Sequence, residues 1–170
     1  MRTLNKILFT GACLLLLLGI SGCGKTGNLT VVFPKIGSAD AALLMTDNAT
    51  ILIDAGEAND GDEILSILDA YDRDTVDLLV ISHYDKDHVG SAAEILANCT
   101  VKRVIGSTSP KESSEVDNYR AALENAGLTE EVPSASINID LGDIHFEIDP
   151  PREAVYSEDQ SNNSSTVVTV

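Results

Sequence analysis

The sequence predicts an α/β fold in which strands and helices form layers (α+β layered), and three observations support this class. Apolar runs of β type and segments of helical period follow one another through residues 29–170. Hydrophobic residues make up 44% of the 170 positions, which is enough to bury the core of one domain. A cluster of polar residues directly follows a buried-type run, where α/β proteins usually place their chemistry.

The domain is expected to open with three antiparallel strands. Residues 29–33, 41–45 and 49–54 are apolar runs of strand length. Thr46-Asp47-Asn48, between the second and third runs, has the residue types of a hairpin turn.

Helical periodicity begins after the third strand. Apolar residues recur at helical spacing over 61–71, and a buried-type strand at 76–82 and a helix at 90–97 follow. The remaining expected elements are a strand at 101–105, a helix at 113–125, a hairpin of 136–140 and 144–148, a polar loop at 157–165 and a final strand at 166–170.

Residues 1–23 resemble a bacterial lipoprotein signal peptide. Arg2 and Lys6 precede an apolar stretch, 7–20, and small residues lead to Cys23. Cleavage there would leave Cys23 as the lipidated N-terminus, followed by a tether at residues 24–28. An uncleaved membrane anchor is the alternative, although the apolar run is short for a bilayer span. Either reading places the domain outside the cytoplasm, anchored to a membrane on the bacterial cell surface.

Cysteine content and charge narrow the possibilities further. Cys13 would leave with the signal and Cys23 would carry lipid, so Cys99 would stand alone and no intramolecular disulfide is expected. The formal net charge is −16 at pH 7, which repels a phosphate backbone at long range. Charge therefore gives no support to a nucleic-acid-binding module.

Residues 83–88 are the most specific feature of the chain. His83, Asp85, Asp87 and His88 place two imidazoles and two carboxylates within six positions after the strand at 76–82. A tight loop at the end of a strand can direct such donors toward one point, and divalent cations accept nitrogen and oxygen ligands. The alternative is that these are solvated loop residues.

The motif resembles the main signature of the metallo-β-lactamase superfamily, His-x-His-x-Asp-His after a strand, and in particular the branch related to the extracellular domain of the competence protein ComEC. Aspartate at the third position, Asp85, is typical of that ComEC-like branch. The resemblance covers most of residues 29–170. Its other elements are Ile36-Gly37-Ser38-Ala39-Asp40-Ala41, Ile51-Leu52-Ile53-Asp54-Ala55-Gly56 and Asn162-Asn163-Ser164-Ser165.

The resemblance implies roles for these residues and a cofactor. His83 and Asp85 would bind a first metal ion, and Asp87 and His88 a second. Asp87 would also act as a catalytic residue that positions the attacking water. The cofactor would be a divalent metal, zinc or manganese, with up to two ions in the complete fold, and Asp85 in place of an imidazole favours harder ions such as manganese.

Four further residues receive weaker assignments. Asp54 would orient the metal-binding loop through hydrogen bonds, or serve only as a turn residue before Gly56. Asn162 and Asn163 would line the cleft, or form a turn. His145 lies in an alternating strand and is expected to be structural or exposed.

The resemblance also implies that the chain is incomplete at its C-terminus. The superfamily normally supplies a further His, a bridging Asp in a Gly-Asp element and often a final His from the second half of its αβ/βα sandwich. Val170 stands where the strand leading to Gly-Asp would run, and nothing follows that strand to complete the sheet edge. We therefore expect the N-terminal half of the sandwich, without tight binding of two mutually repelling ions.

The favoured function is a metal-dependent hydrolase that uses a metal-activated water on a phosphoester or another ester. The substrate would be a small molecule or a phosphoester, and nucleic acid enters only by analogy with the family. The alternative is a truncated, catalytically silent metal-binding surface lipoprotein. The sequence predicts no particular oligomeric state.

Overall fold

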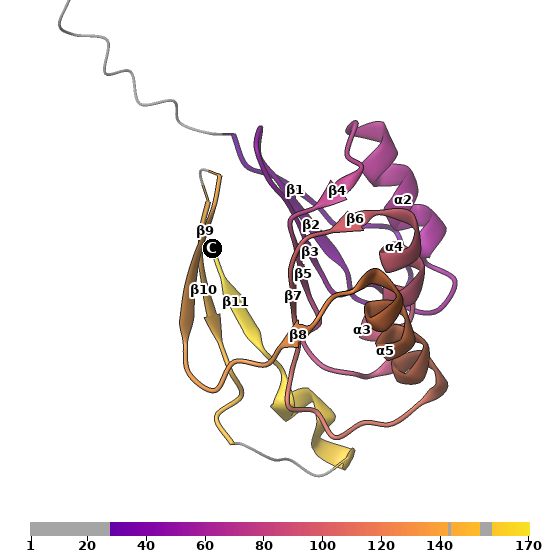
Figure 1. Ribbon diagram of the computed structural model, residues 1–170, viewed down its shortest axis with the longest axis vertical. Helices are drawn as coiled ribbons and strands as arrows, with labels where there is room; N and C mark the ends of the chain where they lie inside the picture. The colour runs from indigo at the N-terminus through magenta and orange to yellow at the C-terminus, as the bar shows by residue number, and fades with distance from the viewer. Residues whose placement is uncertain (1–27, 143, 154–157) are drawn as a thin grey trace, which may run out of the picture.

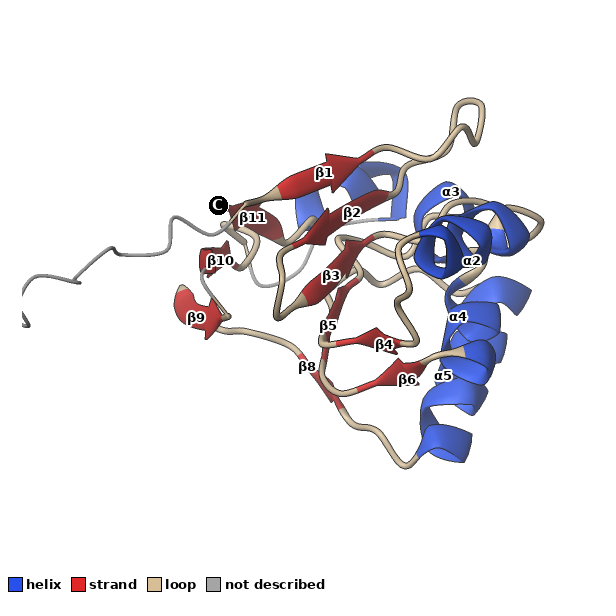
Figure 2. Ribbon diagram, turned by 90° about the horizontal axis from the view of Figure 1, so that it is seen from above, coloured by secondary structure: helices blue, strands red, loops and turns tan. Residues whose placement is uncertain are grey.

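The structure, a computed structural model, describes residues 28–142, 144–153 and 158–170 and consists of three layers. A six-stranded sheet lies in the middle, helices cover one of its faces, and a three-stranded sheet packs on the other (Figures 1 and 2). The α/β class with layered elements is confirmed.

The central sheet begins with the antiparallel strands expected from the sequence. Strands β1 (Thr30–Val32), β2 (Ala42–Met45) and β3 (Thr50–Ile53) pair in order. The turn between β2 and β3 is held by Thr46, whose Oγ1 accepts from the backbone nitrogen of Ala49 at 3.1 Å.

Parallel strands complete the central sheet in the order β1-β2-β3-β5-β7-β8. They are β5 (Leu78–Val80), β7 (Val104–Ile105) and β8 (Glu130–Glu131). Because β3, β5, β7 and β8 are parallel, their carboxyl ends meet at one edge of the sheet. The functional residues described below lie at that edge.

The single strands expected at 76–82 and 101–105 were wrong, because each is divided between two sheets. The short strands β4 (Thr75–Val76) and β6 (Thr100–Val101) pair with each other in a separate parallel sheet. Asp77 lies at the first break and binds Thr50 twice: its carboxylate accepts from the backbone nitrogen of Thr50 at 2.8 Å, and its own backbone nitrogen donates to the carbonyl of Thr50 at 2.8 Å.

Strand β8 was not expected, because two adjacent glutamates have low strand propensity. Both carboxylates are paired in the fold. Arg103 donates two hydrogen bonds to Glu131, at 2.8 and 2.7 Å. Glu130 accepts from the hydroxyls of Tyr84 and Tyr119, at 2.7 and 2.6 Å. These tertiary contacts compensate for the weak propensity.

Three helices cover one face of the central sheet: α2 (Gly61–Ala70), α4 (Ala92–Asn98) and α5 (Ser114–Ala126). Their positions agree with the expected helices at 61–71, 90–97 and 113–125 to within a few residues. Helix α5 follows the clearest local signals, a Ser113 side chain that caps its start and Gly127 at φ 68° after its end. The core beneath the helices includes Leu52, Leu79, Ile81, Ile64, Leu68, Ile95, Val116 and Tyr119.

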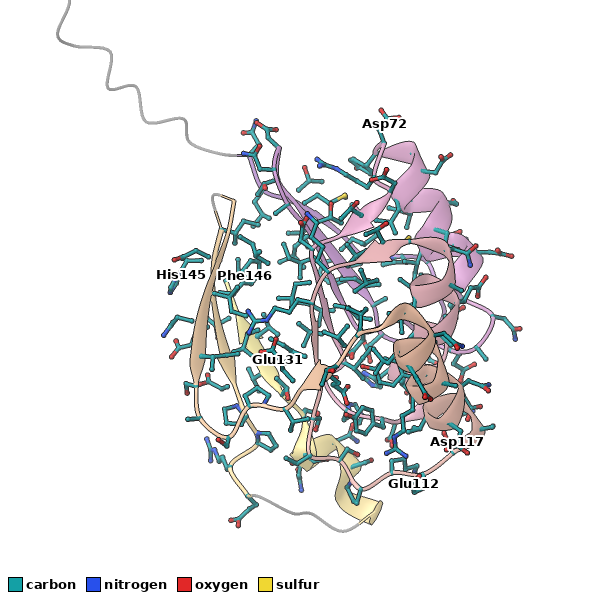
Figure 3. The ribbon with its side chains drawn as sticks, viewed as in Figure 1. Asp72, Glu112, Asp117, Glu131, His145 and Phe146 are labelled. Carbon is teal, nitrogen blue, oxygen red and sulfur yellow. The ribbon has the colours of Figure 1, made fainter. Side chains whose placement is uncertain are left out.

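The other face of the central sheet is covered by the sheet β11-β10-β9, made of β9 (Ile137–Leu141), β10 (Ile144–Asp149) and β11 (Val167–Thr169). Alternation along β10 sets its two faces: Phe146 is fully buried between the sheets, whereas His145 points outward (Figure 3). The expected hairpin is confirmed, and the expected final strand pairs with β10 and forms an edge of this sheet.

The polar segment expected as a loop at 157–165 contains a 3₁₀ helix, η1 (Glu158–Ser164). No helix within the described part of the chain is long and apolar enough to cross a bilayer. The expected signal peptide at 1–23, the lipidation site Cys23 and most of the tether at 24–28 lie outside the described residues.

Candidate metal centre

The candidate site lies where strands β3, β5 and β7 reach the same edge of the central sheet. Asp54 directly follows β3, and Ser82 and His83 follow β5 by two and three residues. Ser107 follows β7 by two residues, and its hydroxyl donates to the backbone carbonyl of Ser164 in η1. The parallel topology therefore gathers residues far apart in the sequence.

The expectation of a loop over 83–88 was partly wrong, because its second half is helical. Helix α3 (Lys86–Val89) begins at Lys86, and Asp85, in an extended conformation, precedes it. The backbone nitrogens of His88 and Val89 donate to the carbonyl of Asp85, at 2.9 and 3.0 Å. The carboxylate of Asp85 does not cap this helix, and it is directed to Ser161, His83 and Lys111 instead.

Backbone hydrogen bonds attach α3 to the loops around it. The carbonyl of Asp87 accepts from the nitrogen of Asp40 at 3.0 Å, and the carbonyl of His88 accepts from Ala55 at 2.7 Å. Gly90 donates to the carbonyl of Gly56 at 2.9 Å. The turn that carries Asp87 and His88 is thus held on two sides.

His88 is oriented by Asp54. The Nδ1 atom of His88 lies 2.8 Å from Oδ2 of Asp54, and Asp54 also accepts from the backbone nitrogen and hydroxyl of Ser82, at 2.8 and 2.7 Å. Asp54 adopts φ 57°, an uncommon value for a non-glycine residue. A carboxylate at Nδ1 favours the proton on that nitrogen, which leaves the lone pair of Nε2 free for a ligand.

His83 presents its Nε2 in a similar way. Its Nδ1 lies 3.1 Å from the hydroxyl oxygen of Ser82 and 3.3 Å from that of Ser165. The side chain of His83 is 3% exposed, and its Nε2 is buried with no hydrogen-bond partner. Buried nitrogens of this kind normally have a partner, so the open position calls for one.

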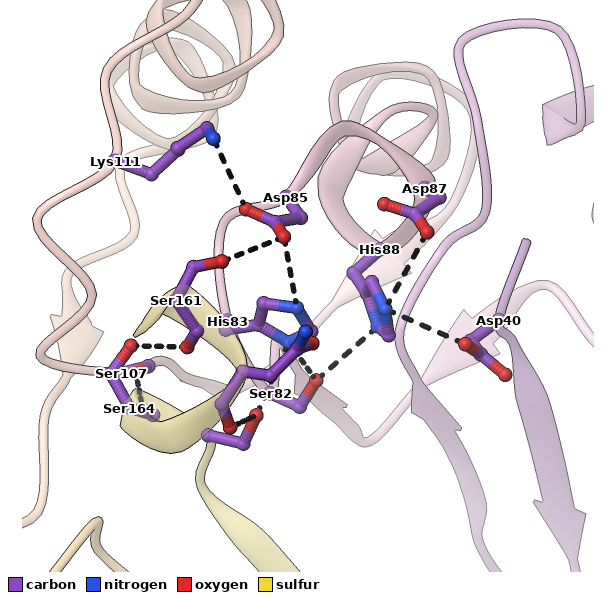
Figure 4. Close-up of polar contacts among 12 residues, drawn as sticks. Asp40, Ser82, His83, Asp85, Asp87, His88, Ser107, Lys111, Ser161 and Ser164 are labelled. Atoms are coloured by element: carbon purple, nitrogen blue, oxygen red, sulfur yellow. Dashed lines mark hydrogen bonds and ion pairs between the residues drawn. The ribbon is translucent and has the colours of Figure 1, made fainter. Parts of the chain in front are cut away.

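Asp85 faces His83 and also contacts residues of two other segments, Ser161 and Lys111 (Figure 4). Its Oδ2 lies 3.6 Å from Nε2 of His83 and accepts from the hydroxyl of Ser161 at 2.7 Å. Its Oδ1 lies 3.6 Å from Nζ of Lys111 and is buried with no hydrogen-bond partner.

The second pair of donors surrounds His88. Its Nε2 lies 3.5 Å from Oδ2 of Asp40 and 4.0 Å from Oδ2 of Asp87 (Figure 4). The rings of His83 and His88 are neighbours, with centroids 3.9 Å apart and planes at 50°. All four residues of the expected ligand set therefore lie close together.

The donors fit a divalent cation in type and spacing. Ligands of a tetrahedral ion at about 2.1 Å lie roughly 3.4 Å from one another. The separations from His83 to Asp85, 3.6 Å, and from His88 to Asp40, 3.5 Å, are close to this value. Each position has two such donors, and among the described residues no group of three or more His, Cys, Asp or Glu side chains is arranged to hold one ion.

The two imidazoles differ in basicity. Burial lowers the pKa of His83 below the usual 6.5, and neighbouring His88 lowers it further. Burial also acts to lower the pKa of His88, but the hydrogen bond and charge of Asp54, together with Asp87 and Asp40, outweigh it and raise that pKa above 6.5. Burial opposes ionisation of Asp85, yet Ser161, His83 and Lys111 hold its pKa below the usual value.

We expect His88 to take up a proton at higher pH than His83 as the metal-free protein is acidified. NMR titration of the imidazole signals in the presence of EDTA, with His88→Gln to assign them, measures both values. Because only a neutral imidazole binds metal, metal release on acidification should begin at His88. Titration of His83 above His88 would contradict this geometry.

Asn162 and Asn163 are not brought into the donor cluster. Both side chains are exposed on η1, and the carbonyl of Asn162 accepts from the backbone nitrogen and hydroxyl of Ser165, at 3.3 and 2.8 Å, as a turn residue does. Their neighbours Ser161 and Ser165 reach Asp85 and His83 instead.

His145 is not part of the donor cluster. It is exposed, and its Nδ1 lies 2.8 Å from the carboxylate of Asp140 on β9. This agrees with the expectation that it is structural or exposed.

No role was expected from the sequence for Asp40, Lys111 or Ser161. The sequence did contain a hint for Asp40, because this residue lies in the segment Ile36 to Ala41, which resembles a family motif. Lys111 and Ser161 had no such signal, since only the tertiary fold brings them to Asp85.

Comparison with known proteins identifies the fold. Among solved structures, the chain is similar to a subclass B3 metallo-beta-lactamase, MEM-A1, isolated from a soil metagenome library, with a TM-score of 0.56 and 15% identity over 79% of this chain and 52% of that one. It is also similar to the Rm3 metallo-beta-lactamase (TM-score 0.53, 17% identity, 73% and 50% covered). A third similar structure is a peroxy diiron species of the chemotaxis sensor ODP (TM-score 0.51, 13% identity, 74% and 53% covered).

The comparisons differ in what they match and in how much of each protein they cover. No curated protein sequence matches the chain. The chain spans about half the length of the solved structures above, with 50%, 52% and 53% of them covered. This agrees with an expected partial αβ/βα sandwich. The model of the metallo-beta-lactamase superfamily matches residues 35–170. The chain therefore belongs to the metallo-beta-lactamase superfamily.

Proposed function

We propose that this chain is a metal-dependent hydrolase that acts on a phosphoester or another ester. The observation that carries the proposal is the buried Nε2 of His83, which has no hydrogen-bond partner and lies 3.6 Å from the carboxylate of Asp85. A divalent ion accepted there would supply Lewis acidity and lower the pKa of a water molecule.

Each residue has a defined task in this proposal. His83 and Asp85 would hold one ion, and His88 with Asp87 a second, with Asp40 as a further donor beside His88. Asp54 fixes the ring of His88 by its 2.8 Å contact with Nδ1. Asp87, half exposed at the mouth of the site, would position the attacking water.

Zinc or manganese is the proposed metal. The carboxylate of Asp85 in place of an imidazole favours harder ions, manganese or iron, over zinc. The similar structure of the chemotaxis sensor ODP is a diiron species, which agrees with a site of this fold that accepts metals other than zinc. Metal analysis of protein grown with each ion would rank them.

We also propose that the chain belongs to the ComEC-like branch. The support is Asp85 at the third motif position together with Asp40, which lies in the segment that resembles the branch and faces His88 at 3.5 Å. The net charge of −16 does not favour nucleic acid as a ligand, so a small-molecule ester or phosphoester is the proposed substrate.

Turnover tests the proposal directly. The full chain, supplied with Mn²⁺ or Zn²⁺, is expected to hydrolyse bis(p-nitrophenyl) phosphate, and His83→Ala should reduce the rate at least about 100-fold because it removes a ligand. His145→Ala, which changes an exposed histidine outside the cluster, should leave the rate unchanged.

Two results would contradict the proposal. Equal turnover by the wild type and His83→Ala would remove the assigned site. Metal binding with no turnover of any ester would favour the alternative of a catalytically silent metal-binding lipoprotein, which the fold and the comparisons do not support.

We further propose that the protein is an extracytoplasmic lipoprotein held to the membrane through Cys23. The support is sequence alone, a positive segment followed by an apolar stretch and a small-residue site ending in cysteine. Cys23→Ala is expected to release the protein from membranes and to abolish its labelling by radioactive palmitate. Unchanged labelling would count against lipidation.

A further inference from the structure

A pocket of about 260 Å³ opens beside the candidate metal centre. Asp85 and Asp87 belong to both the pocket and the donor cluster, so a ligand in the pocket would lie next to a bound ion. The residues that line the pocket are Asp85, Lys86, Asp87, Lys111, Ser113 and Glu115.

The pocket is lined by two lysines, which is unusual in so acidic a chain. The chain has only 11 basic residues against 27 acidic ones, yet two lysines line this pocket. The side chain of Lys86 is 71% exposed and pairs with Glu57 outside the pocket at 3.4 Å. The side chain of Lys111 is 34% exposed and lies over Asp85. Lys111 is therefore the lysine that the fold directs toward the site.

Lys111 is held by charge and not by a hydrogen bond. Its Nζ lies 3.6 Å from Oδ1 of Asp85, beyond normal hydrogen-bond length, and Oδ1 has no hydrogen-bond partner. A divalent ion on Asp85 would carry twice the charge at a shorter distance and would repel the ammonium group. Its three N–H donors would then be available to the pocket.

The formal charge of the pocket also depends on the metal. Three carboxylates and two ammonium groups give the lining a net charge of −1 in the absence of metal. One divalent ion changes this to +1. The pocket would thus attract an anion only when the neighbouring metal position is filled.

We propose that Lys111 binds an oxyanion of the substrate in this pocket and so selects anionic esters over neutral ones. This inference rests on the proposed function, since it assigns the substrate class of the same site. Lys111 acts as a specificity residue and has no part in activating water. In the absence of metal it neutralises Asp85.

Binding of phenylphosphonate, an anion with no ester bond to hydrolyse, tests the inference without turnover. Isothermal titration of the full chain compares the wild type with Lys111→Gln, Lys111→Arg and Lys102→Gln, each with and without Mn²⁺. Lys102 is the matched control, because it pairs with Asp77 at 2.7 Å at the opposite edge of the sheet.

Mn²⁺ is expected to strengthen binding of phenylphosphonate to the wild type. Lys111→Gln should weaken that binding roughly tenfold, because a charge-assisted hydrogen bond is lost. Lys111→Arg should stay within about threefold of the wild type, and Lys102→Gln should match it. Lys111→Gln should also bind Mn²⁺ at least as tightly as the wild type, which a merely structural role would not predict.

Equal affinity of the wild type and Lys111→Gln for phenylphosphonate, or no binding by either, would overturn the inference whatever the turnover. Binding and turnover measured together separate this inference from the proposed hydrolase function. Phenylphosphonate binding that depends on Lys111, with no ester turnover, would uphold the anion pocket and reject the hydrolase.

Discussion

Replacing His88 with alanine is expected to lower the affinity for Mn²⁺ or Zn²⁺ by at least about tenfold. The ring is fixed by Asp54 at Nδ1, and its Nε2 lies 3.5 Å from the carboxylate of Asp40 and 4.0 Å from that of Asp87, so its removal takes away the nitrogen donor of this position. Asp87→Ala should also lower the metal content. Equilibrium dialysis followed by elemental analysis measures both effects.

His145→Ala is the control for this experiment. It removes an exposed imidazole whose contact is with Asp140, and it should not change the metal content. Dialysis at about 0.15 M salt limits weak association of cations with the acidic surface. A larger loss for His145→Ala than for His88→Ala would reassign the ligands.

Replacing Gly90 with alanine should destabilise the fold and the site together. A Cβ at this position would lie 2.5 Å from the carbonyl carbon of Glu57 and 2.6 Å from the nitrogen of Ala58, both backbone atoms that cannot turn away. We expect a loss of ~2–3 kcal/mol in the free energy of unfolding. Metal affinity should fall as well, because the loop that must move also holds the carbonyl of His88 through Ala55.

Gly127→Ala separates steric overlap from backbone strain. Gly127 has φ 68° but nothing within 4 Å of an added Cβ, so the cost should be only about 1 kcal/mol, with no change in metal affinity. Thermal unfolding of the two variants gives both values. Equal stability of Gly90→Ala and the wild type would show that α3 does not pack this closely on the loop.

Much of the fold could be predicted because the signals are local. Alternation along residues 144–148 places Phe146 inside and His145 outside, as the structure has them. Ser113 and Gly127 mark the two ends of α5 in the sequence. The contact of Asp77 with Thr50 and the strand at Glu130 involve partners distant in the chain, and no local pattern contains them.

Tyr84 shows the same limit within the site. As a tyrosine between two polar residues it could be taken for a surface residue, yet it is only 5% exposed. Burial and the carboxylate of Glu130 raise the pKa of its hydroxyl, which donates to Glu130 at 2.7 Å. Tyr84 thus anchors the segment between His83 and Asp85 to β8, a role that becomes visible only in three dimensions.

The proximity of the four motif residues was predictable, but their arrangement was not. The spacing of His83, Asp85, Asp87 and His88 indicated a shared centre, and the fold brings them together. The spacing could not indicate that His83 and His88 face different carboxylates. Nor could it indicate that Asp40 lies beside His88 and Lys111 beside Asp85.

Locating the metal ion tests the central claim most directly. An anomalous difference map from crystals of the zinc-loaded chain should show a peak within about 2.1 Å of Nε2 of His83 or His88, with a carboxylate of Asp85, Asp87 or Asp40 as its neighbour. A peak elsewhere, or full zinc loading with both imidazoles unligated, would contradict the account.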